Sequence, residues 1–370
     1  MKIFRSLIAV LFLVAAVPTP AQADTLITLS KPSFRLADGR FLNNDLATLL
    51  ATDAELDTVL AKPIRGSRTW LIDPALFEEI ADLGDGYVYI DAEGNDVTVD
   101  EFPAAEQWLS LFTFVTRNDR IVAMTYGNPS VSYLRKYAPG ELATYNKLSQ
   151  TRLAEILGRE VSAPSSAAST GNPSAAAQNS YSTLRKSIRV INSLVTTRDV
   201  EDLRLGLAKT LNPGFSKANA LAMVRSYQNE VSEFQKRLRV SPGNYTITAA
   251  KYDLPVTIIN DFDQLVSIDL DITTTNSRVL VSQVPRITLQ PRSQIQINLP
   301  IQVIASGETA LRLQIRTPQG SAIGESTRIP LRLAVISPVT TWFTTGMAII
   351  LLLAAIVQSV RRVKRRKSNE

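Results

Sequence analysis

Two uncharged hydrophobic stretches, one near each end of the chain, limit what this sequence can fold into. The first covers residues 7–17 and follows two basic residues. It is shorter than the roughly 20 apolar residues that a membrane-spanning helix needs, and small residues follow it. We therefore interpret residues 1–23 as a secretory signal peptide that is cleaved after Ala23, with Ala21 as the other small residue of the cleavage site. An uncleaved membrane anchor is the alternative.

The second stretch covers residues 339–360 and contains no charged side chain. As a helix it would be about 33 Å long, which exceeds the hydrocarbon thickness of a bilayer. Trp342 and Phe343 would lie at its outer interface, and the basic tail over 361–370 would lie in the cytoplasm. The basic anchor residues are Arg361, Arg362, Lys364, Arg365, Arg366 and Lys367. This pattern predicts a single-pass protein of the cell membrane with its N-terminal ectodomain outside and the lipid bilayer as one partner; a buried core helix is the alternative.

The composition excludes many functions. The chain has no cysteine and no histidine, which excludes disulfides, Cys/His metal sites and catalysis through imidazole or thiolate. Eight of the 40 basic residues, but only one of the 34 acidic ones, lie in the first five or last ten positions, so the long segment between them is close to neutral. We therefore expect no nucleic-acid partner, and no motif calls for a cofactor.

The remaining chain is long enough for about two domains. Its composition changes at a run of small residues over 162–180, which we interpret as part of a flexible linker. The expected fold class is a multidomain α+β protein with one C-terminal transmembrane helix. Its ectodomain parts are an α/β domain (24–160), a linker (161–180), a helical hairpin (181–240) and an immunoglobulin-like β-sandwich (241–336).

The sandwich prediction depends on a period-two pattern with frequent β-branched residues and regular turn residues. Isoleucine and leucine alternate with glutamine or asparagine from Gln294 to Val303, as in a sheet with one buried and one hydrated face. The expected strands are Tyr245–Ala250, Pro255–Asn260, Val266–Thr273, Arg286–Gln290, Gln294–Val303, Glu308–Arg316 and Ile323–Leu333.

Upstream of these strands, apolar residues spaced by three and four predict helices over Leu184–Thr210 and Phe215–Arg239. The N-terminal part instead alternates strands and helices, which predicts a partly parallel sheet. Its expected helices are Pro74–Leu83 and Pro103–Arg117, and its expected strands are Arg68–Ile72, Tyr87–Ile90, Asp96–Val99 and Arg120–Thr125. In such a sheet, chemistry belongs at the carboxyl ends of the strands.

Five residues near those ends are candidate ligand contacts. Asp73 could contact a sugar or act in catalysis, but an aspartate before a proline is better suited to capping the next helix. Trp70 and Trp108 could stack on a sugar ring, although packing in a core is the stronger interpretation. Tyr126 and Asn128 complete the set. No catalytic, metal or cofactor residues are predicted.

Four segments of the sequence carry a resemblance to known proteins, namely Thr69–Leu76, Ala105–Leu109, Tyr126–Pro129 and Leu254–Asn260. In this order they resemble an actinobacterial family of exported, single-pass envelope proteins of unknown function. The resemblance extends over most of Trp70 to Arg361. Members of that family are often encoded beside the lipid II flippase, which implies a role in the cell envelope. Larger members carry a fuller barrel-like domain similar to carbohydrate-active folds. The resemblance therefore implies that the α/β domain over 24–160 is an incomplete, barrel-like one.

This chain departs from the family pattern at one informative place. Where the family commonly shows Asp-Pro-Asp, it has Asn128, Pro129 and Ser130, so two carboxylates are missing. Glycoside hydrolysis uses a pair of carboxylates. We therefore expect a membrane-anchored extracytoplasmic envelope protein that binds a protein or glycan, with a possible link to cell-wall synthesis, and that is not an enzyme. The alternatives are a carbohydrate-active enzyme on cell-wall glycan, degenerate or not, and an adhesin or receptor-type spacer.

Overall fold

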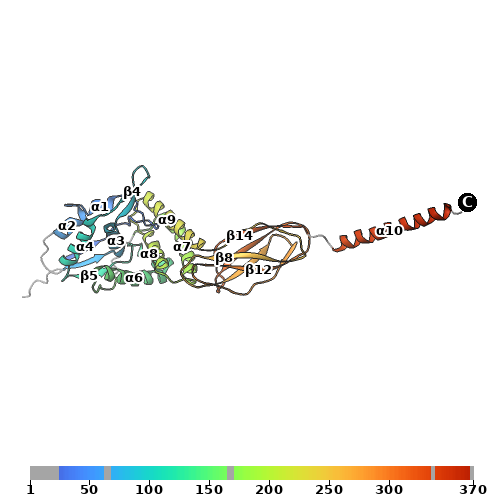
Figure 1. Ribbon diagram of the computed structural model, residues 1–370. Helices are drawn as coiled ribbons and strands as arrows, with labels where there is room; N and C mark the ends of the chain where they lie inside the picture. The colour runs from blue at the N-terminus through green and yellow to red at the C-terminus, as the bar shows by residue number, and fades with distance from the viewer. Residues whose placement is uncertain (1–24, 62–67, 165–170, 335–337, 367–370) are drawn as a thin grey trace, which may run out of the picture. The chain divides into compact units, whose positions relative to one another are not determined.

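A computed structural model shows a chain that divides into two compact units, each described here by itself (Figure 1). Unit 1 contains the residues up to Arg35 and those from Arg40 to Asn172, and unit 2 contains Leu36–Gly39 and the chain from Pro173 onward. The structure describes residues 25–61, 68–164, 171–334 and 338–366.

A parallel sheet of three strands forms the centre of unit 1. Its order is β1 (Thr25–Leu29), β2 (Arg68–Ile72) and β5 (Arg120–Ala123), and both pairings are parallel. Trp70 of the middle strand lies opposite Ile27 on one side and Ile121 on the other. Because the strands are parallel, their carboxyl ends meet at one edge of the sheet.

Helices and a separate hairpin complete unit 1. The antiparallel hairpin β3–β4 lies within the expected bounds, and α3 begins at the expected proline because Asp73 caps it. The predicted barrel-like domain therefore consists of a three-stranded parallel sheet, a two-stranded hairpin and helices. The helices are α1 (Asp45–Leu49), α2 (Glu55–Ala61), α3 (Pro74–Gly84), α4 (Pro103–Val115), α5 (Val131–Tyr137) and α6 (Pro139–Leu157), and the hairpin strands are β3 (Tyr87–Ile90) and β4 (Asp96–Val99).

The core of unit 1 contains a cluster of aromatic rings. Phe112 of α4 is fully buried, and its ring centroid lies 5.3 Å from Trp70, 4.9 Å from Phe77 and 5.5 Å from Trp108. Three of the cluster's contacts are edge-to-face, an arrangement that aromatic rings prefer. The cluster therefore joins α3, α4 and the middle strand of the sheet.

Unit 2 begins with three helices, where a two-helix hairpin was expected. They are α7 (Ala175–Asn192), α8 (Arg198–Lys209) and α9 (Lys217–Lys236). The start of α7 lies inside the predicted linker, because the Ser174 hydroxyl accepts a hydrogen bond from the Ala177 N–H and three alanines follow Ser174. Thr197 caps α8 in the same way. The cap at Thr197 therefore begins a second helix inside Leu184–Thr210, which the apolar spacing predicted to be a single helix.

A close approach between α8 and α9 depends on Gly206. A Cβ atom at this position would lie 2.0 Å from the hydroxyl oxygen of Tyr227 and 2.5 Å from its Cζ. We expect Gly206→Ala to lower the free energy of unfolding by about 1–3 kcal/mol through overpacking. Helix propensity alone would predict a gain of about 1 kcal/mol. Thermal unfolding followed by circular dichroism distinguishes the two.

Gly140 provides the matched control for this substitution. It lies in α6, and a Cβ atom there would meet nothing within 4 Å. Gly140→Ala should therefore leave the stability unchanged or raise it slightly. Equal shifts in the melting temperature for the two variants would show that the contact with Tyr227 does not limit position 206.

The rest of unit 2 is mainly a β-sandwich of two sheets, which confirms that part of the sequence prediction (Figure 1). One sheet has the order β10-β12-β8-β6 and the other β11-β9-β13-β14-β7. All seven expected strands are present within a few residues of their predicted bounds. The sandwich strands are β6 (Leu238–Val240), β7 (Tyr245–Ile247), β8 (Lys251–Asn260), β9 (Val266–Thr274), β10 (Val279–Val281), β11 (Ile287–Leu289), β12 (Ser293–Val303), β13 (Gly307–Arg316) and β14 (Ala322–Leu333).

The four outer strands of the sandwich are short. β10 and β6 flank one sheet, β11 and β7 flank the other, and each of them has three residues. The central strands are much longer, with ten residues in β13 and twelve in β14. β6 and β10 were not predicted from the sequence.

The C-terminal helix α10 (Pro338–Arg366) corrects the predicted fold class and localisation. Among the described residues, no helix combines the length and the apolar character needed to cross a bilayer. The predicted transmembrane helix over 339–360 and the single-pass membrane localisation are therefore wrong. The physical reason lies in the sequence: its strictly apolar run covers only 346–357, which is about 18 Å of helix, and threonine, glutamine and serine flank it.

Several of the predicted end residues lie outside the described parts. This holds for the signal peptide with Ala21 and Ala23 and for Lys367. The side chains of the other proposed anchor residues are also outside the described set, namely Trp342, Phe343, Arg361, Arg362, Lys364, Arg365 and Arg366.

Candidate functional site

The carboxyl edge of the parallel sheet brings three of the five predicted contact residues together. Asp73 follows β2, while Tyr126 and Asn128 follow β5. Asp73 Oδ1 accepts hydrogen bonds from the Ala75 N–H at 3.0 Å and from the Gly127 N–H at 2.8 Å. One carboxylate therefore caps α3 and also fixes the loop that follows the neighbouring strand. Its side chain is fully buried, so it is not presented to a substrate.

Asn128 occupies a position that requires an unusual backbone conformation. Its φ angle is 44°, in the left-handed region that asparagine tolerates better than most residues, and it follows Gly127 with a φ of 73°. The Asn128 amide donates to the hydroxyl of Ser30, just beyond β1, at 3.0 Å. Ser130 caps α5. Asn128 therefore shapes the loop, and Ser130 begins the helix that follows it.

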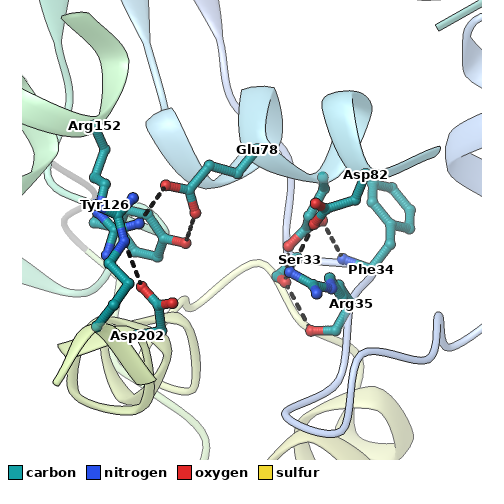
Figure 2. A network of polar contacts seen from close by, with 10 residues as sticks. Ser33, Phe34, Arg35, Glu78, Asp82, Tyr126, Arg152 and Asp202 are labelled. Atoms are coloured by element: carbon teal, nitrogen blue, oxygen red, sulfur yellow. Dashed lines mark hydrogen bonds and ion pairs between the residues drawn. The ribbon is translucent and has the colours of Figure 1, made fainter. Parts of the chain in front are cut away.

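Tyr126 lies within a polar network, shown in Figure 2. Its hydroxyl donates to Glu78 of α3, and its N–H donates to the Ser149 hydroxyl of α6 at 2.7 Å. Arg152 of α6 lies 3.6 Å from the second Glu78 oxygen. Tyr126 is 5% exposed. The network therefore holds the loop after β5 between α3 and α6.

Other acidic residues of α3 anchor the chain that follows β1 (Figure 2). Glu79 is buried, and it accepts hydrogen bonds from the Ser33 hydroxyl and, at 2.8 Å, from the Phe34 N–H. Asp82 lies 2.6 Å from the guanidinium of Arg35. The acidic residues of α3 therefore bind protein groups, which is a structural use of carboxylates.

The two remaining predicted contacts, Trp70 and Trp108, lie inside the core. Trp70 is fully buried and its indole N–H donates to Asp119 at 2.9 Å, while Trp108 is 3% exposed and donates to the Leu56 carbonyl at 2.9 Å. Both rings contact Phe112. Neither indole offers a face on which a sugar could stack.

A cavity of about 710 Å³ lies near the end of α6, and none of the five predicted contact residues lines it. Glu155, Arg159 and Glu160 line it, together with Gln150. Burial lowers the pKa of the Arg159 guanidinium. That group donates to the carbonyl and hydroxyl oxygens of Thr116, so it binds the end of α4.

The hydrogen bonds at the sheet edge position the loop after β5 and the start of α3. Among the described residues, no group of three His, Cys, Asp or Glu side chains could hold a metal ion. Sequence reasoning did not find Glu78, Ser149 and Arg152. The one available signal was the polar series Glu78, Glu79 and Asp82 within an otherwise apolar helix.

The fold and the site define an α+β protein with a β-sandwich, in which the polar groups at the α/β sheet edge are used structurally. Residues 125–370 match the model of a family of unknown function, DUF6049, and the chain belongs to that family. No curated protein matches it.

Solved structures show distant likeness over about a quarter of the chain. WR4, an MSP family member from C. elegans, is 12% identical and is matched over 26% of this chain and 98% of its own, with a TM-score of 0.21. The E. coli chaperone DraB is 13% identical over 27% of this chain and 57% of its own, with a TM-score of 0.21. Native alpha-2-macroglobulin from E. coli, from domain MG7 onward, is 13% identical over 26% of this chain and 16% of its own, with a TM-score of 0.22.

Proposed function

We propose that this chain is a non-catalytic binding protein of the cell envelope that acts on a protein or glycan partner of cell-wall synthesis. The non-catalytic part of this proposal is supported by the two hydrogen bonds that the Asp73 carboxylate accepts. Its carboxylate is fully buried and accepts hydrogen bonds from two backbone N–H groups at the sheet edge where an α/β enzyme would place its chemistry.

The envelope part of the proposal has a different support. It rests on the resemblance of four sequence segments to actinobacterial envelope proteins often encoded beside the lipid II flippase. A sandwich that is joined to a helical layer offers large surfaces for recognition, and this suits a binding role.

A direct test of catalysis uses the purified full chain and purified peptidoglycan. Released reducing ends measure hydrolysis, and released acetate measures deacetylation. We expect wild type and Asp73→Asn to give the same release as a protein-free control. Release above that background, lost in an Asp73→Asn variant that still melts cooperatively, would overturn the non-catalytic proposal.

The cell-wall part needs a test in cells. Depletion of the protein, with fluorescent labelling of newly made wall, should change the amount or the position of the label. Re-expression of the wild type or of Asp73→Asn should restore the normal labelling, in proportion to the amount of each protein in the cell. Unchanged labelling after complete depletion would contradict the link to wall synthesis and favour an unrelated adhesive role.

A further inference from the structure

Unit 2 contains a cleft between its helical layer and the tip of the β13–β14 hairpin. The cleft has a volume of about 390 Å³, within the range of small-molecule sites. Residues of α7 and its C-terminal end form one wall, and residues of the hairpin tip form the other. The lining side chains are Lys186, Arg189, Val190, Ser193, Thr317, Gln319 and Ser321.

The lining carries two positive charges and no negative charge. Lys186 and Arg189 are three residues apart on α7, so they lie on one face of the helix, where like charges repel. α7 contains Arg185 as a third basic residue and no acidic one. Among the described residues, neither Lys186 nor Arg189 has an ion-pair partner. Two exposed cations are therefore held close together without a counter-charge from the protein.

The acidic residues that reach the hairpin tip are already paired with arginines. Arg286 binds Asp269 through two nitrogens, at 2.9 and 3.0 Å, and Arg316 lies 2.8 Å from Asp271. The hydrogen bond from Arg286 lowers the pKa of Asp269, so this carboxylate stays ionised and paired. The same two arginines also donate to backbone carbonyls of the tip, at Pro318 and Gly320. Because these carboxylates are paired with arginines, they do not neutralise the positive charges of the cleft. The hydrogen bonds of the same arginines to the tip carbonyls fix the shape of the cleft wall.

The donors that face the cleft match the chemistry of a phosphate group. Lys186 supplies a compact ammonium and Arg189 a planar guanidinium that can bind two oxygens at once. Gln319 and Ser321 are exposed at the hairpin tip and add neutral donors. A phosphate site needs several donors and no nearby carboxylate, and the lining of this cleft supplies donors and contains no carboxylate.

We propose that this cleft binds the phosphate group of a small phosphorylated ligand of about the size of a sugar phosphate. This deepens the proposed binding role and rests on it, because it names where unit 2 holds a ligand and which chemistry it recognises. Lys186 and Arg189 bind the phosphate oxygens, and the neutral donors of the hairpin tip contact the remainder of the ligand.

The test is calorimetric titration of the purified full chain with glucose 1-phosphate, inorganic phosphate and neutral glucose. Glucose 1-phosphate should bind with a Kd of about 1 mM or tighter, inorganic phosphate more weakly, and glucose not at all. The affinity should fall as the salt concentration rises. Lys186→Ala combined with Arg189→Ala should weaken glucose 1-phosphate binding by about tenfold or more.

Arg312 and Arg328 provide the matched control. They lie opposite each other on β13 and β14, are both exposed, and also have no ion-pair partner among the described residues. Arg312→Ala combined with Arg328→Ala removes the same charge from the same unit and should leave the affinity within about twofold of wild type. Equal losses in the two double variants, or no binding of either phosphate compound by the wild type, would overturn the proposal. Neither result depends on the peptidoglycan assays or the depletion experiment, so failure of this inference would leave the proposed function standing.

Discussion

Phe112→Ala is expected to lower the free energy of unfolding of unit 1 by about 3–5 kcal/mol. The Phe112 ring is fully buried and contacts Trp70, Phe77 and Trp108, so its removal leaves a cavity bordered by three rigid rings. Because rigid rings cannot collapse into this space, the loss of stability should lie at the upper end of the range for replacing a buried aromatic residue with alanine. Urea unfolding followed by tryptophan fluorescence measures the change, because both indoles of unit 1 lie beside the substituted ring.

Phe114→Ala is the control, since it makes the same chemical change two residues further along α4. Phe114 is 65% exposed, and its described ring contact is the guanidinium of Arg117 at 4.6 Å. Its loss should cost no more than about 1 kcal/mol. If the two variants unfold at the same urea concentration, the aromatic cluster does not hold unit 1 together in the way that its geometry implies.

Asp73→Ala is expected to have the second-largest effect, a loss of about 2–4 kcal/mol. The substitution removes the cap of α3 and leaves the buried N–H group of Gly127 without its acceptor. Asp73→Asn should cost less, because an amide oxygen can still accept both hydrogen bonds. Urea unfolding gives the free energies, and limited proteolysis at the loop after β5 reports whether that loop has loosened.

The order of these two variants separates a structural role from a catalytic one. If Asp73 only holds the loop, the wild type should be the most stable, Asp73→Asn less stable and Asp73→Ala the least stable. Cleavage of the loop by the protease should be slowest in the wild type and fastest in Asp73→Ala. Equal stability of all three proteins would contradict the structural role and reopen the catalytic interpretation of Asp73.

The sandwich could be predicted from the sequence because its long strands show the period-two pattern and end at turn residues. The strands that were missed had no such pattern. β6 has three residues directly after α9, so it looked like the last turn of a helix. β1 joins β2 through a pairing of residues more than 40 positions apart, such as Ile27 with Trp70. Long-range pairing of short strands leaves no local signal.

The candidate site shows the same division between local and distant information. The cap of α3 by Asp73 follows from two adjacent residues and could be predicted. The contact of Tyr126 with Glu78, separated by 48 positions, could not. The prediction for the hydrophobic C-terminal stretch was wrong for another reason. It counted all uncharged residues over 339–360, although the strictly apolar part covers only 346–357.

The short outer strands of the sandwich restrict how this protein can associate. A strand of three residues offers few backbone groups to an incoming strand, so none of these four outer strands can by itself pair with a peptide or a second copy over a long ladder. At these four strands, a partner would therefore be recognised through side chains rather than through a backbone ladder. The same four strands are also poor templates for strand-by-strand aggregation when many copies are crowded together.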